Sequence, residues 1–316
     1  MSDDRVTLAM TSAPHIPVLL EEVISALMPD GQTERVVDGT LGAAGHSSAL
    51  LERGADFVLG LDRDPQALAI ARDRLASYGE RANILHHSYE DMKNAAQQIG
   101  WDAVNGILLD LGVSSMQFDT PERGFAFMYD APLDMRFDPT SDQPSASEFV
   151  NFYDPQELSQ IFYKYGEDRN SRRIANAIVK ARPIETTQQL ADVISKASPR
   201  GKGDKIHPAT RVFQALRIAV NDELGTLERT LPVAIDLLRP GGRLAIISFH
   251  SLEDRIVKQY FKDASTEIKS PPGMMLEEKD ATVKLITRKP IIATDKEIAQ
   301  NPRSRSAKLR VVEKLA

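Results

Sequence analysis

Apolar and polar residues follow one another along this chain in blocks whose spacing changes from that of a helix to that of a buried strand. Residues 19–28 carry apolar side chains at intervals of three and four, and Pro29 follows them. Beyond this first helix, short β-branched and aliphatic runs precede helix-compatible segments, and these runs lie at 36–38, 56–62, 83–87 and 104–111. Such a βαβα order predicts a parallel sheet covered by helices.

The alternation stops after residue 117. Residues 118–205 contain a loop rich in Gly and Pro and then amphipathic helical segments. The strand rhythm resumes with a long helical stretch interrupted near Gly225 and Pro232, a fifth strand after the Pro-Gly-Gly turn at 240–242, and two final strands forming a hairpin-like edge. We therefore expect an inserted, mostly helical domain at 118–205 that divides an α/β domain into residues 1–117 and 206–316.

The stretch from Val36 to His46 combines a strand end, Asp38, three glycines spaced three apart and the start of a helix. Glycine at this point of an α/β sheet lets the backbone approach a nucleotide-like ligand. The second glycine of the dinucleotide motif is missing, and the Asp38 carboxylate would repel a pyrophosphate but attract a cationic or amine-bearing ligand. The loop is thus compatible with S-adenosylmethionine, with another nucleotide, or with a purely structural turn.

Acidic residues end two further strands. Asp62 lies at the tip of the second strand, where an acidic side chain can accept hydrogen bonds from ribose hydroxyls; alternatively, Asp62 or Asp64 caps the next helix. Pro65 makes Asp64 the better cap. Tyr89 follows the third strand, where an aromatic ring either contacts an adenine or belongs to the core. Asp110 ends the very apolar fourth strand, where a carboxyl group must be paired or functional.

Composition narrows the function classes. The 316 residues have ordinary hydrophobic (42%) and charged (27%) contents, a net charge of −6 and no cysteine. Disulfides, thiolate metal sites and cysteine nucleophiles are therefore excluded. The acidic N-terminus lacks the apolar centre of a signal peptide, and no run approaches the roughly 18 apolar residues of a membrane span, so we expect a cytoplasmic protein without membrane attachment.

Basic residues cluster in spite of the negative net charge. Lys164–Arg182 holds six basic residues against two acidic ones, and further clusters occur at Arg200–Arg217 and Arg303–Arg310. These clusters are either solvated helix faces or contacts for the phosphates of a nucleic acid.

Taken together, the motifs resemble the ribosomal small-subunit RNA (cytosine-N4) methyltransferases, the MraW/RsmH family. The resemblance runs from residue 15 to residue 313, and the motifs that carry it are DGTLGAAGHS, LDRDPQA, NGILLDLGVSS (with Asn105 in place of an acidic residue), ERGFAFMYDAPLDMRFD, SRRIANAIV, KIHPATRVFQALRIAVNDEL, PGGRLAIISFHSLEDRIVK and NPRSRSAKLR. It implies a class I, Rossmann-like methyltransferase sheet with a helical domain inserted after the fourth strand. It also implies S-adenosylmethionine as cofactor, 16S ribosomal RNA as partner, and cofactor contacts at Ala44, Gly45, His46, Asp62, Tyr89, Asp110 and Gln117. Ala44 stands where the family often has glycine.

This resemblance suggests a mechanism. The N4 amine of cytosine is a poor nucleophile, so a hydrogen-bond acceptor must orient it toward the methyl group. We expect Asp110 to be that acceptor and His250 to assist, whereas Phe125, Phe127 and His250 are candidates for stacking on the target base. No metal requirement is indicated. The oligomeric state, and whether naked RNA or an assembled subunit is the substrate, stay open.

Two other functions remain possible at this stage. A non-catalytic RNA-binding ribosome-assembly factor on a methyltransferase fold would need no polar acceptor at Asp110, so full turnover by Asp110→Asn would favour it. A nicotinamide-dependent oxidoreductase would also fit an α/β sheet, but the missing second glycine argues against it.

Overall fold

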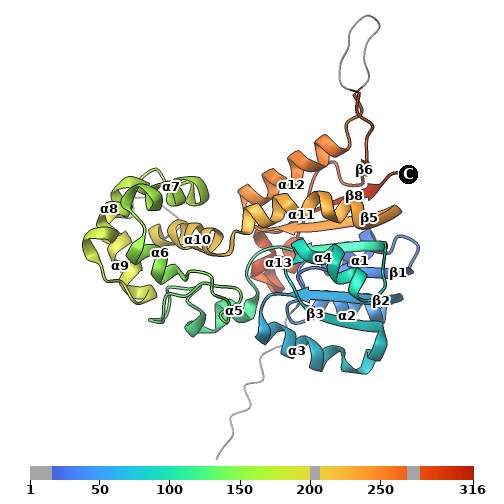
Figure 1. The fold of residues 1–316 in the computed structure, drawn as a ribbon, viewed down its shortest axis with the longest axis horizontal. Helices are drawn as coiled ribbons and strands as arrows, with labels where there is room; N and C mark the ends of the chain where they lie inside the picture. Colours follow the sequence, from blue (N-terminus) through green and yellow to red (C-terminus); the bar gives the residue numbers. More distant parts are fainter. Residues whose placement is uncertain (1–15, 200–206, 269–277) are drawn as a thin grey trace, which may run out of the picture.

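The computed structural model describes residues 16–199, 207–268 and 278–316, which form an α/β lobe and a helical lobe lying side by side (Figure 1). The α/β lobe is built on one sheet of order β3-β2-β1-β4-β5-β8-β6, with β7 pairing to β8. Its strands are β1 Thr33–Asp38, β2 Ala55–Asp62, β3 Ala82–His86, β4 Val104–Asp110, β5 Leu238–Ser248, β6 Val283–Leu285, β7 Ile291–Ile292 and β8 Lys308–Lys314.

Strands β1 to β5 are parallel, so their carboxyl ends lie along one edge of the sheet. Strand β8 is antiparallel and pairs with both β5 and β6. Apolar residues alternate through the strands and fill both faces of the sheet, which explains why the sequence shows nearly continuous hydrophobic runs. The predicted hairpin-like edge is therefore a three-strand arrangement around β8.

Helices cover both faces of the sheet. One face packs against α1 Leu20–Leu27, α2 Gly45–Glu52 and α3 Pro65–Leu75, and the other against α4 Met92–Gln98, α11 Glu223–Leu237 and α12 Ser251–Ala264. The remaining elements of this lobe are the short helix α13 Asp295–Gln300 and the 3₁₀ turns η1 Ala76–Arg81, η2 Tyr89–Asp91 and η4 Pro302–Ser306. No described helix is long and apolar enough to cross a bilayer.

The second lobe begins after β4 and has its own hydrophobic core. Its elements are α5 Ser115–Asp119, η3 Pro121–Arg123, α6 Ala146–Phe152, α7 Pro155–Gly166, α8 Ser171–Ala181, α9 Thr187–Ala197 and α10 Pro208–Asn221. Ser145, Asp154 and Thr186 each cap a helix and form a reciprocal capping box, so the boundaries follow from local sequence.

Helix α10 shares the core of this lobe, through side chains such as Val212 and Phe213. The sequence predicts an insertion that ends at residue 205; because α10 packs against α6, α7 and α9, we propose that the insertion extends to Asn221. The predicted interruption of the long helix also lies elsewhere. It falls at Asp222, whose φ of +47° ends α10, whereas Gly225 and Pro232 lie inside α11.

Candidate active site

A pocket opens where the carboxyl ends of the parallel strands meet the first loop of the helical lobe. The turn after β1 supplies residues 39–43, and single residues at the ends of β2 and β4 supply Asp62 and Asp110. The other described residues that line it are Pro17, Val18, Gly45, His46, Arg63, Ala67, His87, Tyr89, Leu111, Gly112, Val113, Ser114, Met116, Gln117, Phe137, Glu223, Leu227, Phe249, Glu253 and Arg303. Segments distant in sequence thus share one cavity.

The glycine turn folds tightly around this pocket. Gly42 has a φ of +51° and donates its N–H to Asp62 Oδ2 at 2.7 Å, which joins the turns after β1 and β2. A Cβ on Gly45 would lie 2.6 Å from Cγ of Pro17, so only glycine fits there. Ala44 adopts a φ of +59° and is fully buried; it lies behind the lining residues and contributes the left-handed residue that begins α2.

Asp38 does not face the pocket, contrary to the expectation of a carboxylate beside the ligand. It is 1% exposed, and its oxygens accept hydrogen bonds from Ser47 Oγ at 2.7 Å and from Thr40 N at 3.2 Å. Burial raises the pKa of Asp38 to about 6, against the lowering effect of the Ser47 hydroxyl. Asp38 therefore ties the glycine turn to α2.

The prediction that Asp64, rather than Asp62, caps the following helix is confirmed. Asp64 caps α3 by accepting a hydrogen bond from Gln66 N at 3.0 Å, and Pro65 is the first helical residue. Asp62 lines the pocket, but each of its oxygens already accepts one backbone N–H, from Gly42 and from Asp64. Since each carboxylate oxygen has a second lone pair, Asp62 can still accept a hydrogen bond from a ligand.

Tyr89 lies in η2 with its ring against the pocket, packed on the core beneath the sheet. Burial raises the pKa of its hydroxyl well above the ordinary value. A Cβ on residue 39 would lie 2.9 Å from the Tyr89 Cβ, so Tyr89 can pack at this position only because residue 39 is glycine.

Asp110 presents a carboxyl group with unsatisfied hydrogen-bonding capacity. Its Oδ1 is buried and, among the described residues, has no hydrogen-bond partner, while its Oδ2 lies 3.8 Å from His46 Nδ1. Burial, with smaller contributions from Asp38 and Glu253, raises the pKa of Asp110 to about 8. His46 Nε2 lies 3.0 Å from the carbonyl oxygen of Val18, which orients the imidazole toward Asp110. The pocket thus contains a buried acceptor that a cationic or N–H-bearing ligand would satisfy.

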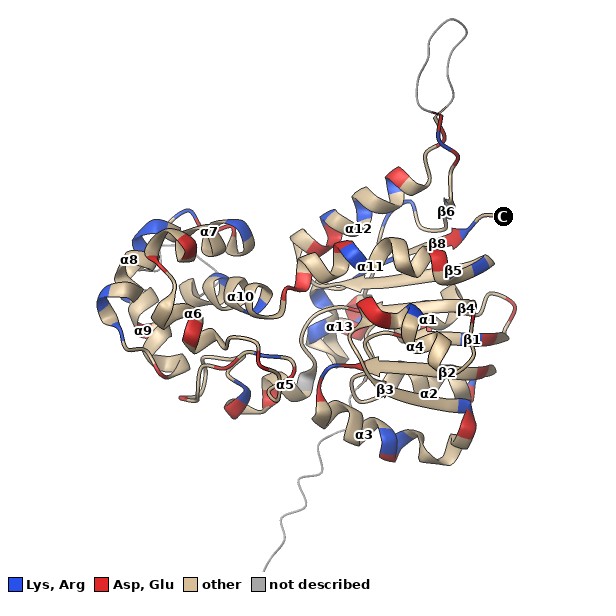
Figure 2. Cartoon of the chain, viewed as in Figure 1, with Lys and Arg blue, Asp and Glu red and all other residues tan. Residues whose placement is uncertain are grey.

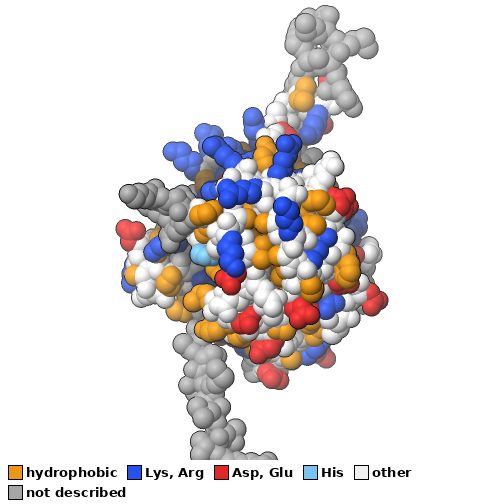
Figure 3. Space-filling model, turned by 90° about the vertical axis from the view of Figure 1, so that its left-hand side faces the viewer, with side chains coloured by type: hydrophobic (Ala, Val, Ile, Leu, Met, Phe, Trp, Pro, Cys, Tyr) orange, Lys and Arg blue, Asp and Glu red, His pale blue; other side chains and the backbone are white. Residues whose placement is uncertain are grey.

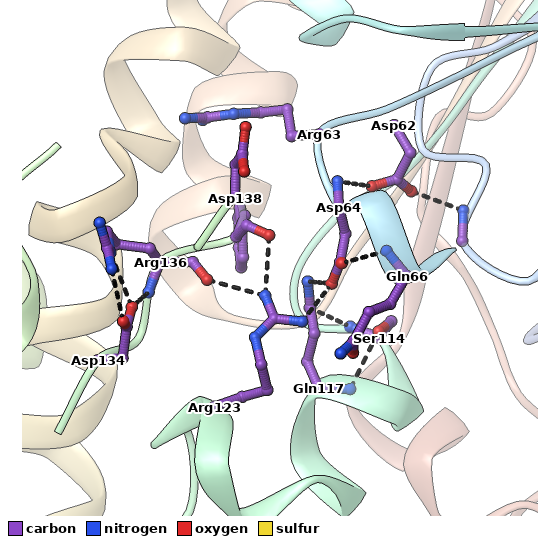
Figure 4. A network of polar contacts seen from close by, with 12 residues as sticks. Asp62, Arg63, Asp64, Gln66, Ser114, Gln117, Arg123, Asp134, Arg136 and Asp138 are labelled. Atoms are coloured by element: carbon purple, nitrogen blue, oxygen red, sulfur yellow. Dashed lines mark hydrogen bonds and ion pairs between the residues drawn. The ribbon is translucent and has the colours of Figure 1, made fainter. Parts of the chain in front are cut away.

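Gln117 lines the pocket wall, but its amide is engaged at both ends. Its Oε1 accepts a hydrogen bond from Ser114 N, and its Nε2 donates to Asp64 Oδ2 at 2.9 Å. The same Asp64 oxygen is paired with Arg123 at 2.6 Å (Figure 4). Gln117 therefore joins the α/β lobe to the start of the helical lobe.

His250 is not among the described residues that line this pocket. It caps α12, and its Nε2 lies 3.1 Å from Glu253 Oε1. Glu223, His250 and Glu253 come close enough to suggest a metal site, but Arg217 pairs with Glu223 at 2.7 Å and Glu253 accepts the N–H groups of the turn before α12. The carboxylates of Glu223 and Glu253 are therefore engaged in structural contacts.

The aromatic side chains that face the pocket differ from those expected. Phe125 is buried and stacks on Phe137, with ring centroids 5.9 Å apart, and Phe127 packs on Phe213 within the helical lobe. Phe137 and Phe249 line the pocket instead. The sequence offers a weak signal for Phe249, which directly follows β5, and none for Phe137, which lies in an aperiodic loop.

Lys and Arg side chains gather on the outer face of the helical lobe (Figures 2 and 3). Within Lys164–Arg182, Arg172 and Arg173 are exposed on α8. Residues 200–206 of the predicted cluster Arg200–Arg217 lie outside the part of the chain that the structure describes. At the other end of this cluster, Arg217 forms an ion pair with Glu223. In Arg303–Arg310, Arg303 and Arg305 are exposed, and Arg303 pairs with Asp119 at 2.9 Å. Lys308 and Arg310 pair with Asp254.

Comparison with known proteins agrees with this geometry. The family model described as "MraW methylase family" matches residues 12–315. The chain belongs to the MraW methylase family. A relative from Geobacter sp. (strain M21), named ribosomal RNA small subunit methyltransferase H, is 52% identical over 95% of this chain and 98% of its own. A relative of the same name from Nitratidesulfovibrio vulgaris is 51% identical over 98% of this chain and 88% of its own.

Among solved structures, an rRNA methylase from Streptococcus thermophilus is 12% identical and covers 96% of this chain and 99% of its own, with a TM-score of 0.43. Membership of the MraW methylase family confirms three predictions: the Rossmann-like α/β sheet with a helical insertion, the methyltransferase activity, and S-adenosylmethionine as cofactor. It also removes the nicotinamide-dependent oxidoreductase from consideration.

Proposed function

We propose that this methyltransferase modifies the exocyclic N4 amine of a cytidine in 16S ribosomal RNA, within the small ribosomal subunit. The observation that carries the proposal is the Asp110 carboxyl group, which ends β4 inside the pocket with a buried oxygen that accepts no hydrogen bond from the described residues. The names of the relatives supply the class of RNA.

The pocket residues fit S-adenosylmethionine, which supplies an electrophilic methyl group when bound. The turn at 39–45 would hold it, with Gly42 and Gly45 allowing close approach of the backbone. The free lone pairs of Asp62 would accept hydrogen bonds from ribose hydroxyls, and the ring of Tyr89 would lie against the adenine. Asp110 would face the cationic end, where a positive charge favours its carboxylate form and lowers its pKa.

Asp110 then acts on the target base. As a carboxylate it accepts a hydrogen bond from the N4 amine, which orients the nitrogen lone pair toward the methyl group and stabilises the positive charge that develops on nitrogen. Once the bond between the methyl carbon and the donor sulfur has given way to the N–C bond, the same carboxylate is placed to take the amine proton, and a pKa near neutrality suits both roles. His46 orients Asp110, whereas His250 lies outside the pocket and caps the N-terminus of α12.

The base itself needs an aromatic partner. We assign this role to Phe137 from the helical lobe, with Phe249 on the opposite lobe as the second ring. Capturing a splayed base in this way is less costly for single-stranded RNA than for a paired strand. Exposed basic residues, Arg172 and Arg173 on the helical lobe and Arg303 at the pocket, would contact phosphates on either side.

The test is transfer of isotopically labelled methyl groups to small ribosomal subunits that lack the modification, followed by digestion to nucleosides and mass spectrometry. Label on N4 of cytidine that is lost in Asp110→Ala is the expected result. Naked 16S RNA, assayed in parallel, distinguishes the assembled subunit from RNA alone as substrate. Label on another atom, or full turnover by Asp110→Asn, contradicts the proposal, and the latter would favour an assembly factor.

A further inference from the structure

Arg123, the last residue of η3 in the helical lobe, is a buried arginine whose guanidinium makes three contacts beside the pocket. Its side chain is 7% exposed. One guanidinium nitrogen, Nη1, pairs with Asp64 Oδ2 at 2.6 Å, and the other, Nη2, donates to the carbonyl oxygens of Arg136 at 2.9 Å and Phe137 at 2.8 Å (Figure 4). One side chain therefore joins the N-cap of α3 in the α/β lobe to the backbone of a loop in the helical lobe.

The α/β partner in this contact belongs to the turn after β2, next to the pocket residue Asp62. Asp64 is 1% exposed, and its backbone N–H donates to Asp62 Oδ1 at 2.9 Å. Asp62 in turn accepts the N–H of Gly42. Arg123 is thus connected to the glycine turn through a chain of three hydrogen bonds, although it makes no contact that would recognise a cofactor.

The helical-lobe partner is the backbone of the residue whose ring faces the pocket. The Phe137 carbonyl is held by Arg123, and its N–H donates to Asn221 Oδ1 at 2.7 Å. Its ring stacks on the ring of Phe125. The Arg123 guanidinium also lies over the Phe125 ring, 5.8 Å from its centroid. Both backbone groups of Phe137 and one ring face are consequently fixed by buried residues.

A second set of contacts brackets the same loop. Arg63, next to Asp62, donates to the carbonyl of Asn221 at 3.3 Å, and His86 at the end of β3 lies 3.4 Å from Asp138. These contacts are more exposed than the Asp64–Arg123 pair, so they restrain the loop less. Of these three contacts, the buried Asp64–Arg123 pair restrains the position of Phe137 most strongly, in addition to the hydrogen bond from Asn221 within the helical lobe.

We propose that Arg123 is a positioning residue for methyl transfer: it ties Phe137 to the cofactor-binding turn through Asp64 and so sets the distance between the stacked target base and the methyl donor. This inference rests on the proposed stacking role of Phe137. Arginine suits the task because its planar guanidinium serves a carboxylate and two carbonyls at once, which the single ammonium of lysine does not do in that geometry.

The test is a double-mutant cycle with Arg123→Gln, Phe137→Ala and the double variant, assayed on small subunits lacking the modification. A misplaced reacting group typically costs about ten- to a hundredfold in rate. We expect Arg123→Gln to lower kcat by about that factor with the Kd of S-adenosylmethionine within about twofold of the parent. In the Phe137→Ala background, the same substitution should have little further effect on kcat, because residues that act as a unit are not additive.

Two variants separate positioning from loss of stability. Arg123→Lys keeps the charge beside Asp64, and we expect it to retain the melting temperature better than Arg123→Gln while recovering little of kcat. Glu313→Gln removes a partly buried ion pair with Arg243, 3.0 Å long, between β5 and β8 and away from the pocket; it should lower stability and leave kcat unchanged.

The outcomes distinguish the inference from the function on which it rests. Multiplicative effects of Arg123→Gln and Phe137→Ala on kcat would overturn the positioning role, as would full recovery of kcat in Arg123→Lys. If Phe137→Ala alone left both kcat and KM for the subunit unchanged, the stacking role would be wrong and the inference would fall with it. If the parent protein did not methylate cytidine N4, the proposed function itself would be wrong.

Discussion

Replacing Asp110 by Asn should inactivate the protein and make it more stable. In the folded chain the pKa of Asp110 is raised to about 8, whereas an unfolded aspartate titrates near 3.8. At pH 7 the unfolded chain has lost this proton and the folded chain still holds it, so folding must take up a proton. Asparagine has the same shape and carries no such cost.

The magnitude follows from the difference between the two pKa values. From 3.8 to pH 7 the cost grows by about 1.4 kcal/mol per pH unit, which gives about 4 kcal/mol. The side chain is 24% exposed, and water that reaches it reduces this cost, so we expect Asp110→Asn to stabilise the fold by about 2 kcal/mol. For a chain of this size that corresponds to a rise in melting temperature of roughly 4 °C.

The dependence on pH is the sharper part of the prediction. Between about pH 4 and pH 8 the unfolded chain holds fewer protons at this group than the folded chain, so the stability of the parent protein falls as pH rises. The advantage of Asp110→Asn should therefore be near zero at pH 4 and largest at pH 8, as measured by thermal melting across this range.

Asp62→Asn is the matched control, because the pKa of Asp62 is also raised by burial but both of its oxygens accept backbone N–H groups. An amide keeps only one acceptor, so this variant should lose stability. An Asp110→Asn protein that melts below the parent at pH 8, or whose advantage does not change with pH, would refute the reasoning.

Three further predictions concern ligands. The affinity for S-adenosylmethionine, measured by calorimetry, should increase from pH 6 to pH 9 relative to that for S-adenosylhomocysteine, which lacks the sulfonium charge, since Asp110 attracts the sulfonium only in its carboxylate form; parallel pH profiles would contradict this. Gly45→Ala should weaken S-adenosylmethionine binding by about tenfold or more, because its Cβ would displace Pro17 from the pocket wall; an unchanged Kd would show that the turn adapts. Reversing Arg172 and Arg173 to Glu should weaken binding to small-subunit RNA and flatten its salt dependence without altering cofactor affinity, whereas the matched pair Lys258→Glu and Lys262→Glu on α12 should have a smaller effect; loss of cofactor binding as well would identify the two arginines as structural.

The architecture could be predicted from local patterns because the features that determine it are local. Hydrophobic periodicity located the parallel strands, and the break that it predicts after residue 117 lies close to the point where the chain leaves β4 for the helical elements. Pro65 identified Asp64 as the helix cap, since proline at the first helical position fixes where α3 begins.

The same patterns did not reveal which core a helix joins. The apolar face of α10 has the period of any amphipathic helix, and only packing shows that Val212 and Phe213 belong with the helical lobe. Likewise, an aspartate that ends a strand beside glycines has the same sequence signature whether it lines the pocket, as Asp62 does, or accepts a hydrogen bond from a serine hydroxyl, as Asp38 does.

Contacts across long sequence separations were equally hidden. Asp64 and Arg123 are 59 residues apart, and neither lies in a motif that names the other. Phe137 was missed because its place in the pocket depends on a buried arginine and on Asn221, 84 residues further along the chain. Gln117 was expected at the cofactor, but its short helix turns its amide toward Asp64.

The position of β8 has a consequence for how the chain folds during synthesis. Residues 308–314 fill the place between β5 and β6, so until they leave the ribosome the outer edge of β5 presents unpaired N–H and C=O groups. Arg303, just before this strand, and Phe249, just after β5, both face the pocket. A nascent chain therefore exposes an unpaired sheet edge, next to the pocket residue Phe249, until β8 inserts between β5 and β6.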